Sequence, residues 1–243
     1  MRAEAHRLFV AWEPRAEPLE VAARRLVQSL DWLRSLPELE GSWTAVHRRT
    51  GAILPCDGVE DALRCLEAGA YPIEPETSPA SPPPPELYRQ CFYLGPFQKW
   101  RAKIVLACGF ARPSFGDEAP NGFELWVPPP LPPIALRQAL VGLIGVHLPV
   151  WGVVGSESFP ASRTAHDGAP SAGWLTYLSS WFGPPAPLGA PVLTSNLGHL
   201  GALYQAFSGT FDRADAAHVA GVRALERSLR AAGALRPYAP APG

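Results

Sequence analysis

The chain has 243 residues, of which 47% are hydrophobic and 18% are charged, and its formal net charge at pH 7 is −1. This composition excludes an intrinsically disordered chain, and it gives no indication of the basic face with which free nucleic-acid binders hold phosphates. The length fits one domain, or two small ones, with a sizeable hydrophobic core.

The cysteines and the N-terminus favour a cytoplasmic protein. None of the four cysteines forms a C-x-x-C pair, and the first residues lack the apolar segment of a secretory signal peptide. Reduced thiols are therefore expected. The run from Gln138 to Ser156 contains no Asp, Glu, Lys or Arg. However, His147, Pro149 and several glycines interrupt it, which favours a buried helix followed by a strand over a membrane span.

Strands and helices alternate irregularly in the first third of the chain. Leu8–Trp12 is a short apolar run and predicts a strand. Apolar residues at helical spacing predict a helix from Glu17 to about Leu36, where Pro37 ends it. Trp43–Arg48 predicts another strand, and Val59–Ala68 predicts a short helix closed by a glycine.

Residues 72–85 form a proline-rich insertion. Seven prolines stand there among Glu, Ser and Thr, a composition that cannot build a hydrophobic core. We expect an exposed loop. The alternative is a docking segment for a proline-binding partner, which would make the protein an adaptor; deleting residues 76–85 would decide between the two.

The middle of the chain predicts two strands, one centred on Ile104–Ala107 and one at Gly122–Val127. A helix is predicted at about Ile134–Val146, with five inward-facing residues: Leu136, Ala139, Leu140, Leu143 and Ile144. Trp151–Ser156 and Gly173–Ser179 then predict two strands. In the second strand, Trp174, Thr176 and Leu178 share one face.

Strand segments interrupted by Gly198 and Gly201 are predicted between Val192 and Phe207. The chain closes with a helix whose buried stripe is Val219, Val222, Leu225 and Leu229.

Asp212 or Asp215 can cap this last helix, and Gly233 can end it. Residues 237–243 are expected to be disordered. No strict βαβ repeat appears, which predicts an α+β fold: a mixed, mainly antiparallel sheet packed against about four helices in a single compact domain over residues 1–236.

The sequence shows no convincing catalytic, cofactor or metal site. Gly152–Ser156 lacks the third glycine and the lysine of the common phosphate-binding loops, and no two histidines stand four residues apart. We therefore predict no enzyme, no cofactor and no metal. The alternative is a small hydrolase or a damage-reversing enzyme that uses Ser156 or His166, and it requires a nucleophile, a base and a carboxylate that converge in one pocket.

Two motifs carry a resemblance to a known family. Trp151–Ser156 (WGVVGS) and Gly173–Ser179 (GWLTYLS), followed by the last helix, resemble the immunity protein 52 family of bacterial polymorphic toxin systems. The resemblance covers residues 135–236. It implies that Trp151, Gly152, Gly173, Trp174 and Tyr177 define the fold.

The resemblance also implies a function in interbacterial competition, including type VI secretion. Relatives are expected to bind and neutralise a cognate secreted toxin, mostly a nuclease of the restriction-endonuclease fold, in a toxin–antitoxin relationship. The partner would then be a protein, with no direct contact to nucleic acid or membrane. Whether the protein is a monomer or a homodimer stays open.

An acidic segment is the candidate surface for such a toxin. Residues 55–86 hold seven acidic side chains and one arginine. Because a nuclease must bind an anionic backbone, its cleft is basic, and carboxylates could occlude it. The candidate toxin-binding residues are Asp57, Glu60, Asp61, Glu74, Glu76, Trp174 and Tyr177. For the two aromatic residues, packing in the core is the alternative.

Overall fold

The computed structural model describes residues 4–13, 17–71, 87–108, 121–129, 131–156 and 170–236. Within these ranges, four α-helices accompany antiparallel strand pairs, which confirms the predicted α+β class. The chain divides into two compact units: unit 1 comprises residues 1–11 and 126–243, and unit 2 comprises residues 12–125. No feature of the sequence indicated this division, and the domain limits of 1–236 stay a prediction.

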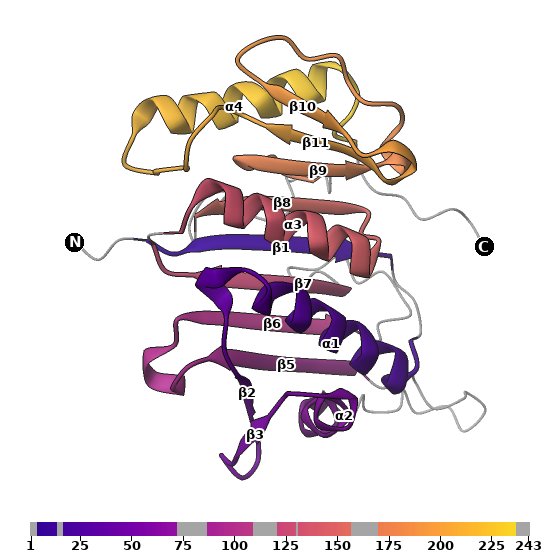
Figure 1. Ribbon diagram of the computed structural model, residues 1–243. Helices are drawn as coiled ribbons and strands as arrows, with labels where there is room; N and C mark the ends of the chain where they lie inside the picture. Colours follow the sequence, from indigo (N-terminus) through magenta and orange to yellow (C-terminus); the bar gives the residue numbers. More distant parts are fainter. Residues whose placement is uncertain are drawn as a thin grey trace. The chain divides into compact units, whose positions relative to one another are not determined.

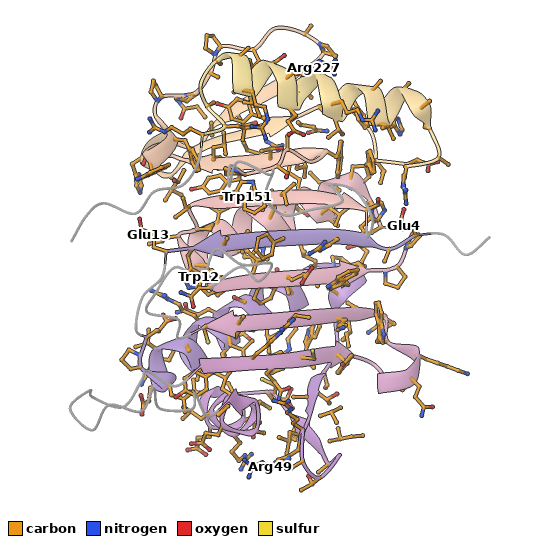
Figure 2. The ribbon with its side chains drawn as sticks, turned by 180° about the vertical axis from the view of Figure 1, so that it is seen from behind. Glu4, Trp12, Glu13, Arg49, Trp151 and Arg227 are labelled. Carbon is orange, nitrogen blue, oxygen red and sulfur yellow. The ribbon has the colours of Figure 1, made fainter. Side chains whose placement is uncertain are left out.

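Unit 1 is built on a sheet with the strand order β10–β11–β9–β8–β1, in which each neighbouring pair is antiparallel. Its strands are β1 (His6–Trp12, the last residue of which belongs to unit 2), β8 (Trp151–Ser156), β9 (Leu175–Ser179), β10 (Leu193–Asn196) and β11 (Gly201–Gln205). Its helices are α3 (Pro133–His147) and α4 (Ala216–Ala231). Figures 1 and 2 show the two helices on opposite faces of this sheet.

Helix α3 packs closely on β8 because β8 offers a glycine at the contact. A Cβ atom on Gly152 would lie 3.0 Å from Val10 Cγ1 and 3.1 Å from Leu140 Cδ1, so a larger residue would require these two side chains to shift. The five residues predicted to face inward on α3 are all buried. The apolar, helical spacing of the sequence therefore identified the correct face.

Helix α4 has the predicted ends. The Asp215 carboxylate accepts a hydrogen bond from the Ala217 backbone N–H at 2.8 Å, so Asp215, one of the two candidates, is the N-cap. After the helix, Gly233 adopts φ +69°, the left-handed conformation typical of a helix end. The side chains of Val222, Leu225 and Leu229 are fully buried, as the periodicity predicted, whereas Val219 is half-buried.

The break between β10 and β11 also follows the prediction. Gly201 has φ +125°, and a Cβ atom there would lie 2.2 Å from the carbonyl oxygen of Leu178. Gly198, with φ +65°, opens the short turn before it. Glycine is required at Gly201 both by its backbone conformation and by the close approach of β9.

Unit 2 is built on a sheet with the order β7–β6–β5–β2–β3, to which β4 adds by pairing with β5. Its strands are β2 (Trp43–Val46), β3 (Ile53–Pro55), β4 (Ala70–Tyr71), β5 (Leu87–Leu94), β6 (Ala102–Cys108) and β7 (Asn121–Val127, the last two residues of which belong to unit 1). Its helices are α1 (Leu19–Arg34) and α2 (Val59–Ala68).

Helices α1 and α2 lie on one face of the unit 2 sheet, with α1 across β5 and β6 (Figure 1). Helix α1 buries Ala22, Ala23, Leu26, Leu30 and Leu33. On β5, the buried Gln90 side chain donates a hydrogen bond to the Cys65 carbonyl oxygen of α2 at 2.9 Å, which ties this helix to the sheet. In the described residues, the opposite face of β5 and β6 carries no helix (Figure 2).

Strands β3, β4 and β5 were not predicted, and β9 begins at Leu175, two residues later than expected. None of the described helices combines the length and the apolarity that a membrane crossing would require. The proline-rich residues 72–85 and the tail 237–243 lie outside the described residues.

Candidate functional site

The aromatic residues of the family-like motif lie in the core of unit 1. Trp174 and Tyr177 are each 1% exposed. The Trp174 indole N–H donates to the Phe207 carbonyl oxygen at 3.3 Å, and the Tyr177 hydroxyl donates to the Leu200 carbonyl oxygen at 2.5 Å. Burial raises the pKa of Tyr177 to about 12. In this arrangement neither side chain offers a surface to a partner, so we assign both to packing, the alternative already considered for them.

Two further motif residues are positioned by close contacts. The ring of Trp151 meets that of Phe9 edge-on, with centroids 5.3 Å apart, on the side of β8 that faces away from α3 (Figure 2). A Cβ atom on Gly173 would lie 2.3 Å from Val153 Cγ2 and 2.4 Å from the Val154 carbonyl oxygen. Only glycine fits there without displacing β8, which supports a fold-defining role for this residue.

The exposed carboxylates of unit 2 gather where α1 ends and α2 begins. We call this region the acidic surface and define it by four residues: Asp31, Asp57, Glu60 and Asp61. All are exposed except Asp61, which is half-buried. The structure thus brings the predicted Asp57, Glu60 and Asp61 together. It adds Asp31 from α1, which was not among the residues predicted from the sequence.

Arg34 holds the two parts of the acidic surface together. Its guanidinium donates to Asp31 Oδ1 at 3.0 Å and to Asp57 Oδ1 at 3.1 Å. It also donates to the Cys56 carbonyl oxygen at 2.7 Å. The two carboxylates remain 62% and 59% exposed, so they stay accessible while their positions are fixed.

The acids of α2 also stabilise their own helix. Asp61 Oδ2 accepts a hydrogen bond from the Asp57 backbone N–H at 3.3 Å, and its other oxygen pairs with Arg64. Glu60 and Asp61 occupy the first helical turn, where negative charge is favourable. Part of the acidic surface therefore has a structural role as well as the predicted role in toxin binding.

Helix α1 also carries an exposed tryptophan, one residue after Asp31 in the sequence. Trp32 follows Asp31 on α1 and remains 40% exposed, whereas Leu33, the next residue, is fully buried. Tryptophan is the residue most enriched among those that dominate binding energy at protein interfaces. The sequence-based prediction missed Trp32 because its helical position, between the buried Leu30 and Leu33, does not reveal how much of the ring is exposed.

Beneath the acidic surface, two buried thiols fix the link from β3 to α2. The hydrogen bond that Cys56 shares with Cys65, together with burial, raises the pKa of Cys56 above its usual range. The Cys65 thiol also donates a hydrogen bond to the Pro55 carbonyl oxygen, which lies 3.5 Å from Sγ. Both cysteines are free thiols. This packing sets the position of Asp57, which immediately follows Cys56.

The remaining predicted residues give no further support to a site. Glu74 and Glu76 lie outside the described residues, as does His166. Ser156 is buried, and its hydroxyl makes no hydrogen bond within the described part of the chain. Among the residues that the structure describes, no group of three metal-ligating side chains is found either. The convergence that the hydrolase alternative requires is therefore not seen where the structure can be described.

A known protein family matches the C-terminal part of the chain. Residues 131–238 match the family model of immunity protein 52, the family that the WGVVGS and GWLTYLS motifs indicated. The match contains α3, β8–β11 and α4, all in unit 1. No curated protein matches the chain.

A solved structure shares the fold over most of the chain. It is described as Pseudomonas aeruginosa T6SS protein PA0821, and the superposition has a TM-score of 0.61 at 14% sequence identity. It covers 96% of this chain and 76% of the other. At this level of identity the similarity shows a common fold, which includes both units.

Proposed function

We propose that this protein is an immunity protein that binds and neutralises a cognate secreted toxin. The observation that carries the proposal is the match of residues 131–238 to the immunity protein 52 family. The fold shared with a type VI secretion protein of Pseudomonas aeruginosa supports a setting of interbacterial competition. The protein would act in the cytoplasm, where an incoming toxin meets its target, by binding and without catalysis.

We further propose that the toxin is a nuclease of the restriction-endonuclease fold and that the acidic surface blocks its cleft. A nuclease cleft carries the basic residues that hold the phosphate backbone. Asp31 and Asp57, fixed by Arg34 but still exposed, offer opposite charge to such a cleft. Complementary charge mainly accelerates association, and Trp32 would supply the apolar anchor that slows dissociation.

Co-expression with the toxin encoded beside this gene tests the proposal. Cells that carry the toxin should survive when this protein is present, and the two proteins should co-purify as a stable complex. A nuclease from an unrelated toxin system serves as the control and should kill the cells in both cases. Survival without a complex would favour the enzyme alternative over binding. Cell death despite a soluble, folded protein would contradict the immunity function.

A further inference from the structure

Two cysteines of unit 2 have their thiols in contact. Cys56 directly follows β3, and Cys65 lies on α2, nine residues later. Both side chains are fully buried, and both are free thiols. The Cys65 Sγ lies 3.5 Å from the carbonyl oxygen of Pro55, the residue before Cys56, and the two thiols share a hydrogen bond. The link from β3 to α2 therefore brings two sulfur atoms together.

The hydrogen bonds give the two thiols different chemistry. Because the Cys65 thiol donates to the Pro55 carbonyl oxygen, Cys56 is the donor in the bond that the two thiols share. This donor stabilises a thiolate at Cys65, so the pKa of Cys65 is lowered although its burial acts in the opposite direction. The thiolate is the form of cysteine that reacts with oxidants. Cys65 is thus the thiol that reacts first, and Cys56 is the thiol beside it that can complete a disulfide.

The other two cysteines of unit 2 cannot pair with each other. Cys91 on β5 stands opposite Val105 of β6, whereas Cys108 on β6 stands opposite Tyr88. Three positions along the strand pair separate these cysteines, or about 10 Å, which is too far for a disulfide. Cys91 is half-buried and so more accessible than Cys56 or Cys65. It shows whether an oxidant joins thiols by contact or merely attacks the accessible one.

We propose that Cys56 and Cys65 are an oxidation site, at which a peroxide converts the two thiols into a disulfide between β3 and α2. The Cys65 thiolate attacks one oxygen of the peroxide, breaks the O–O bond and becomes a sulfenic acid. The Cys56 sulfur then attacks the Cys65 sulfur and displaces its oxygen. Two thiols and one hydrogen peroxide thus give one disulfide and two water molecules. A peroxide of this size suits a buried pair, whereas glutathione disulfide is too bulky to reach it.

The disulfide fixes the segment that carries the acidic surface. Asp57 immediately follows Cys56, and Asp61 lies one helical turn before Cys65. A covalent link across this short loop restricts the unfolded chain, so the oxidised protein should resist unfolding more than the reduced one. The oxidation site does not depend on the proposed toxin binding, because only the thiols and the stability of this chain are involved.

Peptide mapping by mass spectrometry, after the full chain is treated with hydrogen peroxide, tests the oxidation site. The digest should contain a peptide that joins Cys56 to Cys65, about 2 Da lighter than the sum of its two thiol parts, and dithiothreitol should separate them. The melting temperature should rise by about 5 °C on oxidation and return on reduction. A wild type in which Cys56 and Cys65 stay unjoined, or in which another pair is joined instead, would overturn the proposal.

Three alanine variants separate the pair from the other thiols. Cys91→Ala removes only a thiol outside the pair, so it should form the same disulfide and show the same rise in melting temperature. Cys65→Ala should show neither. Cys56→Ala should stop at a sulfenic acid on Cys65, which dimedone traps as an adduct. The wild type and Cys91→Ala keep both paired cysteines, so they test the site even if a substitution in the buried pair disturbs folding. Absence of the disulfide in Cys91→Ala would contradict the assignment.

Discussion

The two units of this protein differ in what their conspicuous residues do. In unit 1, the motif that resembles the immunity family supplies Trp174 and Tyr177, which are buried and hydrogen-bonded to backbone carbonyls. In unit 2, the carboxylates of Asp31, Asp57 and Glu60 are exposed, and so is Trp32. The comparison teaches that the residues by which the family is recognised can maintain the fold, while the residues proposed to contact the toxin lie outside the family match.

Replacing the buried tryptophan should have the largest effect. Trp174→Ala removes a fully buried ring and leaves a cavity, so the free energy of unfolding should fall by about 3–5 kcal/mol. Urea denaturation would measure it. If Trp174→Ala retained the stability of the wild type but no longer bound the toxin, the assignment of this residue to packing would be wrong.

The exposed tryptophan should show the opposite pattern. Trp32→Ala should weaken toxin binding by about 30-fold, or 2 kcal/mol, because an aromatic anchor is lost at the interface. Its effect on unfolding should be smaller than that of Trp174→Ala, about 1 kcal/mol, since the ring is already partly in water. Calorimetric titration with an inactive toxin would report the affinity. An unchanged affinity would remove Trp32 from the proposed interface.

Charge reversal on the acidic surface should act mainly on the association rate. The double variant Asp57→Lys with Glu60→Lys should slow association by about tenfold at low salt, and the difference should shrink as salt screens the charges. Glu20→Lys is the matched control, because Glu20 is exposed on α1 but lies at the other end of that helix from Asp31. Equal rates for the two variants would show that the toxin approaches another surface.

A smaller effect should appear in the pH dependence of unit 1. Burial of His6 lowers its pKa from 6.5, an effect that Asp212 partly opposes. The unfolded chain therefore binds a proton more readily, and stability should fall as the pH drops below about 6.5 through the lowered value. His6→Gln should flatten this slope, whereas His199→Gln, at an exposed position, should not. Denaturation at several pH values would give the free energy of unfolding of each variant as a function of pH. Equal slopes for His6→Gln and the wild type would contradict the prediction.

Much of unit 1 could be predicted because its local signals agree with its packing. The helical spacing of α3 and α4, the Asp215 cap and the glycines at the start of β11 each act within a few residues. These signals also identify which face is buried, since the apolar stripe must meet the sheet.

Strand β5 in unit 2 illustrates what could not be predicted. It follows the proline-rich insertion, and its sequence Leu87–Leu94 shows no clean alternation, because the polar Gln90 is buried to bind α2. The acidic surface was only partly visible for a similar reason. Asp31 and Asp57 are far apart in sequence and are brought together by Arg34, a tertiary contact that no local pattern encodes.

The most direct test of the account is the activity of the purified toxin as this protein is added. We predict that cleavage of its nucleic-acid substrate falls in proportion to the amount of protein and stops near an equimolar ratio, as expected for tight occlusion of the cleft. The Trp32→Ala variant should stop cleavage only when it is added in molar excess over the toxin. Full cleavage at a large molar excess of the folded wild type would contradict the claim that this protein neutralises the toxin by binding.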